Sequence, residues 1–132
     1  MVAEKQPKTG ADSPDDIQRA VAAYAQSEKV KSGLIWTCQI ADQVAAMEGP
    51  GYQQGVQLLT TLARLVAGES ELAGRVTGDG RWHEIGENIN MALVMIRSGV
   101  PRETGFHLTR AISRVTRIGG QAASILRERG LF

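Results

Sequence analysis

The chain has little of what several protein classes require. One cysteine in 132 residues excludes an intramolecular disulfide and a cysteine-rich metal site. No apolar run approaches the roughly 18–20 residues that span a bilayer, so we expect no membrane segment. The net charge is +1, so no overall field attracts the protein to nucleic acid or to a membrane surface. Aromatic residues are 5% of the chain and no segment alternates apolar and polar residues, which favours an all-α fold.

The length fits one domain that can bury a core without disulfides. Residues 1–12 are polar and contain proline and glycine, which predicts a disordered N-terminal tail. These residues have no apolar stretch typical of a secretory signal, so we expect a cytoplasmic protein. Residues 13–132 are predicted to form a single helical-bundle domain.

Helix start and stop signals divide this domain. Ser13-Pro14-Asp15-Asp16 combines a capping residue, a first-turn proline and two acids, so we expect a helix over residues 14–47. Its apolar register falters at residues 27–33, which leaves open one kinked helix or two, and we favour one helix with a defect near Gly33. Gly49-Pro50-Gly51 breaks the chain. Further helices are expected over 51–67, 82–98 and 102–129, with a loop at 68–81.

Each expected helix carries apolar residues at helical spacing. The first carries Ile17, Val21 and Tyr24, and then Leu34, Cys38, Ala41 and Ala45. In the second, Leu58 and Leu65 widen an apolar side formed by Val56, Leu59, Leu62, Ala63 and Val66. In the last, the apolar side recurs about every 3.5 residues, at Leu108, Ile112, Val115, Gly119, Ala122 and Leu126. The sequence therefore predicts a four- to five-helix up-and-down bundle, with Gly119-Gly120 at a close helix approach.

Residues 91–96, MALVMI, are apolar on every side of their helix. The core stripe is expected at Trp82, Ile85, Ile89, Ala92, Leu93 and Ile96. Met91, Val94 and Met95 fall on the opposite side, at roughly 180–280° on a helical wheel. That side is either covered by the first helix or forms a subunit interface or a partner groove. We predict a non-catalytic protein that acts through these three residues, by self-association as a homo-oligomer or by binding a partner protein.

Two pairs, His83 with Glu87 and Glu103 with His107, have the four-residue spacing seen in metal sites of helical bundles. The turn at residues 99–101 makes their helices antiparallel. His83 then lies roughly 24 Å along the axis from the turn beside which Glu103 lies. The pairs therefore do not share a metal within one chain, and no metal site is predicted.

Other signatures of chemistry are weak. Cys38 lies on an apolar helical stripe, which is typical of a small buried residue rather than a nucleophile. Gly78-Asp79-Gly80 is followed by neither Lys-Ser nor Lys-Thr, so it is no phosphate-binding loop. We therefore expect no catalytic residue and no cofactor, and the protein is not predicted to be an enzyme.

Arg110, Arg114 and Arg117 share one stripe of the last helix. Three arginines in this arrangement could follow a phosphate backbone, or they could belong to a solvated face of mixed charge. No aromatic residue is interleaved among them to stack on bases. The alternative function is nucleic-acid binding, in which these arginines contact the phosphate backbone.

Residues 85–90, IGENIN, continuing to Ser98-Gly99, resemble the helical hairpin of plasmid mobilisation (relaxosome accessory) proteins. The likeness spans about residues 84–130. It implies an accessory role at a transfer origin, beside a ribbon-helix-helix unit that binds DNA. Met91 stands where that family has glutamine. The same residues also have a physical explanation: Gly86 allows close helix approach near Trp82, and Asn88 and Asn90 fix helix register by hydrogen bonds.

Overall fold

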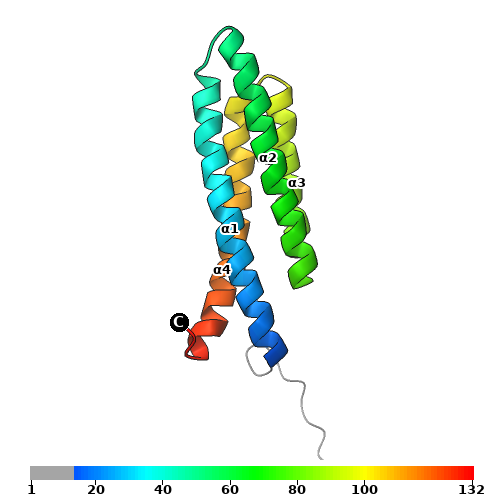
Figure 1. The fold of residues 1–132 in the computed structure, drawn as a ribbon, viewed down its shortest axis with the longest axis vertical. Coiled ribbons are helices and arrows are strands. Elements are labelled where there is room, and N and C mark those ends of the chain that lie inside the picture. Colours follow the sequence, from blue (N-terminus) through cyan, green and yellow to red (C-terminus); the bar gives the residue numbers. More distant parts are fainter. Residues whose placement is uncertain (1–13) are drawn as a thin grey trace, which may run out of the picture.

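The computed structural model describes residues 14–132, so the tail predicted at residues 1–12 lies outside the described residues. All regular secondary structure in this part of the chain is helical. It comprises α1 (Pro14–Ala45), α2 (Pro50–Thr77), α3 (Arg81–Arg97), the 3₁₀-helix η2 (Pro101–Glu103) and α4 (Thr104–Glu128). The helices lie along one long axis, as the prediction of an all-α fold requires (Figure 1).

Each helix packs beside the next one in the chain, and α4 closes the ring against α1. Gly33 of α1 faces Val66 of α2, and Gly55 of α2 faces Val44 of α1, which makes these helices antiparallel. In this part of the chain the backbones of α1 and α3 do not come close to each other, because the two helices lie diagonally across the ring. The turns between helices contain glycines with positive φ, at Gly49, Gly78 and Gly99.

The first helix is a single element, as favoured from the sequence, and Gly33 does not interrupt it. A Cβ at Gly33 would lie 3.0 Å from Val66 Cγ2, so the glycine allows α2 to approach closely. The expected apolar face at Ile17, Val21 and Tyr24 is wrong, because the buried positions of this half are Ala20, Ser27 and Val30.

The loop expected over residues 68–81 is also wrong, since α2 continues to Thr77. The buried side of α2 continues at helical spacing through Val66, Ser70, Ala73 and Thr77. The Thr77 hydroxyl donates to the Ala73 carbonyl at 2.7 Å. The helix ends at Gly78, whose φ of 67° is left-handed and whose N–H reaches the Gly74 carbonyl.

The core faces of the last two helices agree with the sequence prediction. Trp82, Ile85, Ile89, Ala92 and Ile96 of α3 are buried, as are Leu108, Val115, Gly119, Ala122 and Leu126 of α4. The close approach predicted at Gly119 is confirmed, because a Cβ there would lie 3.0 Å from Ser27 Cβ of α1. Asn88 fixes the register of α3 against α4 by accepting a hydrogen bond from the Arg114 guanidinium.

Candidate interaction surfaces

The most exposed large apolar side chains of α2 form a regular row. Leu58, Leu65 and Leu72 are seven residues apart, and Val76 follows one turn after the last. Leu58 is 71% exposed and Leu65 is 63% exposed, although both are leucines on a helix inside a folded bundle. Residues seven apart lie on one side of an α-helix, displaced by only about 20°. The row therefore presents one apolar edge along most of α2.

An exposed tryptophan of α1 extends this apolar edge. Lys29 Nζ lies 2.6 Å from Glu69 Oε2, so the side of α1 that carries Lys29 faces α2. Trp36 is seven residues further along, on the same side of α1, and is 60% exposed. The contact of Gly33 with Val66 places Trp36 nearly level with Leu65. We call Trp36, Leu58, Leu65, Leu72 and Val76 together the leucine face.

The sequence prediction did not assign this surface. It placed Leu58 and Leu65 on a widened core side, whereas the structure exposes both. The seven-residue recurrence of Leu58, Leu65 and Leu72 was a readable signal. It was missed because α2 was expected to end at residue 67, before the third leucine.

The predicted contact residues of α3 lie on the outer side of the bundle. Met91 and Val94 are 43% and 49% exposed, and Met95 is partly buried. Because α3 packs against α2 and α4 but not against α1, burial of this side under the first helix is excluded in the described part of the chain. The interface prediction for these three residues stays a prediction.

The three arginines of α4 are only partly free to bind a ligand. Arg114 donates to Asn88 and lies 3.5 Å from Glu84 Oε2. The Arg110 guanidinium lies 5.7 Å above the ring of Phe106. Arg117 is exposed. These contacts tie the middle of the stripe to the bundle, which does not favour the stripe as a phosphate-backbone surface.

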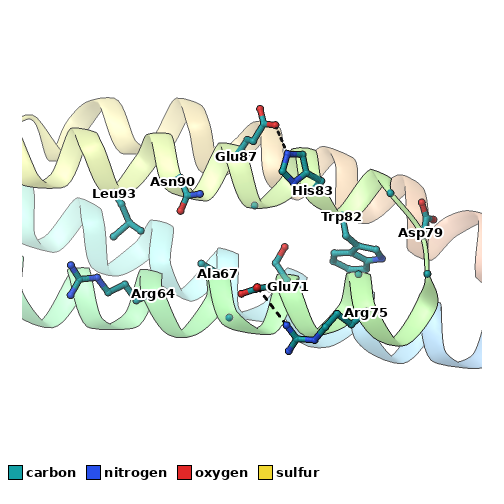
Figure 2. A pocket seen from close by; sticks show the side chains of 16 residues that line it. Arg64, Ala67, Glu71, Arg75, Asp79, Trp82, His83, Glu87, Asn90 and Leu93 are labelled. Atoms are coloured by element: carbon teal, nitrogen blue, oxygen red, sulfur yellow. Dashed lines mark ion pairs between the residues drawn. The ribbon is translucent and has the colours of Figure 1, made fainter.

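A groove of about 830 Å³ lies between α2 and α3. Figure 2 shows Trp82 at one end of it and Arg64, Asn90 and Leu93 toward the other. Small residues make up much of its lining, namely Ala67, Gly68, Gly74, Gly78, Gly80 and Gly86. Gly74, rather than the expected Gly86, lies against Trp82, since a Cβ at Gly74 would be 3.3 Å from Trp82 Cβ. The space between these two helices is thus filled only in part.

The two pairs that have metal-ligand spacing in the sequence, His83 with Glu87 and Glu103 with His107, lie apart, as expected. His83 Nε2 lies 2.9 Å from Glu87 Oε1 on the rim of the groove. His107 makes an edge-to-face contact with Phe106 at 5.3 Å between ring centroids. Within residues 14–132 no group of three or more His, Cys, Asp or Glu side chains could hold a metal ion. Cys38 is partly buried against the core, and desolvation together with Asp42 raises the pKa of its thiol.

Asp79 lies between the left-handed turn at Gly78 and the start of α3 at Arg81. Its carboxylate accepts a 2.9 Å hydrogen bond from the Arg81 backbone N–H and pairs with the Arg81 guanidinium at 2.7 Å. Hydrogen bonding by Arg81 lowers the pKa of the Asp79 carboxyl. The pair therefore stabilises the turn only while Asp79 is ionised.

Replacing Asp79 by asparagine is expected to retain the capping geometry and remove the charge. Because both side chains of the pair are partly exposed, we expect a loss of less than about 1 kcal/mol in the free energy of unfolding at neutral pH. The lowered pKa means that this contribution is complete above about pH 4 and disappears as pH falls through the folded-state value. Urea unfolding of both proteins at pH 7 and pH 2.5 measures it. A difference that persists at pH 2.5 contradicts the assignment.

None of the helices in the described part is both long enough and apolar enough to cross a membrane. Comparison of the chain with protein-family models, with curated proteins and with solved structures finds no match. The resemblance of residues 84–130 to plasmid mobilisation proteins stays a prediction. Function must therefore be argued from the surfaces themselves.

Proposed function

We propose that the protein acts by helix-mediated self-association, with the leucine face as the contact between two copies of the chain. The observation that carries this proposal is the exposure of Leu58, Leu65 and Leu72 at seven-residue spacing beside Trp36. Burial of a fully exposed leucine contributes roughly 1.5–3 kcal/mol, and these side chains, 36–71% exposed, gain a share of it, so covering the whole face favours association. An exposed apolar surface of this kind is typical of an interaction site.

A second copy is the partner that this pattern fits. Leu58 and Leu72 are each seven residues from Leu65, so the row maps onto itself when its direction is reversed. Two antiparallel α2 helices related by a two-fold axis at Leu65 therefore place Leu58 beside the partner's Leu72. Such an interface uses the same patch on both copies, as most homodimers do.

The charges beside the leucine face fit the same arrangement. Lys29 and Glu69 are already paired with each other within the chain, at 2.6 Å. A second copy brings the same neutral pair, so the interface buries no unmatched charge. No catalytic step is needed for this function.

Light scattering on the purified chain at two protein and two salt concentrations tests the proposal. We expect a mass of twice the 14.2 kDa of one chain, retained at high salt because the contact is apolar. A monomer at both protein concentrations contradicts it. Absorbance at 260 nm recorded on the same peak tests the alternative, nucleic-acid binding through Arg110, Arg114 and Arg117, which requires a salt-sensitive complex.

A further inference from the structure

The groove between α2 and α3 is hollow because side chains are missing from its walls. A Cβ at Gly68 or at Gly86 would have no atom within 4 Å. By contrast, Gly33, Gly55 and Gly119 each lie against a side chain of a neighbouring helix. Glycine inside a helix is unfavourable. Close packing explains the glycines that lie against a neighbouring helix, but it does not explain Gly68 and Gly86. The space at Gly68 and Gly86 is open to a molecule from outside the chain.

Two buried polar groups of the groove lack a hydrogen-bond partner in the described part of the chain. They are the Ser70 hydroxyl, on a side chain that is fully buried, and Trp82 Nε1–H, on a side chain that is 2% exposed. Elsewhere on α2, the hydroxyls of Thr60 and Thr77 donate to the carbonyl four residues earlier. Buried polar groups are normally paired, so Ser70 offers a ligand a hydroxyl that both donates and accepts, and Trp82 offers an N–H donor.

The opposite end of the groove carries an arginine without an ion pair. On the rims, Arg75 pairs with Glu71 and His83 pairs with Glu87, whereas Arg64 has no ion pair among residues 14–132. Figure 2 shows Arg64 and Asn90 projecting from the two walls at the same end of the groove. A guanidinium and a carboxamide at the same end of a groove supply the donors that a carboxylate prefers.

We propose that this groove binds a small, flat, apolar carboxylate with a hydrogen-bonding group at its far end. Arg64 and Asn90 hold the carboxylate, the apolar body lies along Ala67 and Gly86, and the far group reaches Ser70, on the side of the groove toward Trp82. Six residues separate Arg64 from Ser70, about 9 Å along the helix, which matches one aromatic ring with a short acid tail. The groove volume of about 830 Å³ is within the usual range for ligand sites. This binding is independent of self-association, because the groove and the leucine face lie on different sides of α2.

The probe we would use is 3-(4-hydroxyphenyl)propionate, titrated into the ¹⁵N-labelled full chain and followed by NMR. The buried Trp82 indole N–H is distinguished from that of exposed Trp36 by its slower hydrogen exchange. We expect the Trp82 signal to shift and the Trp36 signal to stay. The neutral amide of the probe should bind about tenfold more weakly, and 3-phenylpropionate, which lacks the hydroxyl, several-fold more weakly.

Three variants locate the site. Arg64→Gln should weaken binding about tenfold, Ser70→Ala several-fold, and Gly86→Leu should abolish binding by filling the groove. Gly86→Leu has room for its side chain, so its helicity by circular dichroism should match that of the original chain. Arg127→Gln is the matched control, because Arg127 is exposed on α4 away from the groove, and it should bind as before.

The proposal is overturned if neither this probe nor a panel of one- and two-ring carboxylates shifts the Trp82 signal at millimolar concentration. It is equally overturned if binding survives in the folded Gly86→Leu variant, since the ligand then lies elsewhere. Equal affinity of the acid and its amide would also contradict it, because Arg64 would then contribute nothing.

Discussion

Leu65→Glu is expected to convert the associated protein to a monomer while its helicity is retained. Leu65 lies at the centre of the leucine face, so the two-fold axis brings the two substituted side chains together. Two carboxylates would then be desolvated beside apolar residues and beside each other, which is strongly unfavourable. Because Leu65 is 63% exposed within one chain, the fold itself loses little. Light scattering and circular dichroism on the same sample measure both effects.

Two matched variants separate the leucine face from other surfaces. Gln57→Glu adds the same charge to α2 at an exposed position about 100° around the helix from Leu58, and it should leave the mass unchanged. Val94→Glu places the charge on the outer side of α3, the contact expected from the sequence. If Val94→Glu dissociates the protein and Leu65→Glu does not, the interface is on α3 and our assignment is wrong.

Gly119→Leu is expected to destabilise the fold by about 1–3 kcal/mol, the usual cost of overpacking. A Cβ at this position would lie 3.0 Å from Ser27 Cβ, and the remaining leucine atoms would force α1 and α4 apart. Intrinsic helix propensity acts in the opposite direction, since leucine is a better helix former than glycine. A loss of stability therefore reports the helix contact itself. Urea denaturation measures the free energy of unfolding.

Gly120→Leu is the control for that experiment. Gly120 is the next residue of α4, but it is exposed, and a Cβ there would meet no atom within 4 Å. Only helix propensity should act, so we expect stabilisation by a few tenths to about 0.8 kcal/mol. The two adjacent substitutions should thus have opposite signs. Equal effects would show that Gly119 is not at a tight crossing of α1 and α4.

The parts of the fold that the sequence predicts well are those whose core residues are large. Leu108, Val115 and Leu126 mark the buried side of α4 unambiguously, and Trp82 and Ile89 do the same for α3. Regular spacing of large apolar residues is a strong signal because only one face of the helix can then be the buried face. A register hydrogen bond was likewise expected of Asn88, although its partner, Arg114, was not predicted.

The sequence misleads where the core is built from small or polar residues. Ser27 is buried because it lies against Gly119, so the apolar register of α1 only looked interrupted. Ser70 and Gly74 are part of α2, and their residue types suggested a loop. Once α2 was expected to end early, neither the leucine face nor the groove could be assembled from the sequence.

The two proposals concern different sides of α2. Leu58, Leu65 and Leu72 lie on the side next to α1, whereas Arg64 and Ser70 border the groove toward α3. A bound carboxylate therefore does not compete with a second copy of the chain. The account predicts that Leu65→Glu leaves probe binding intact and that Gly86→Leu leaves the mass intact.

Site-specific cross-linking tests the central claim, contact through the leucine face, most directly. Leu65→Cys would be made in a Cys38→Ser background, which removes the chain's one native thiol. A two-fold axis at Leu65 brings the two new thiols together, so mild oxidation should give a covalent dimer in high yield. Val94→Cys in the same background should give no covalent dimer under these conditions. Cross-linking at Val94 without cross-linking at Leu65 would contradict the account.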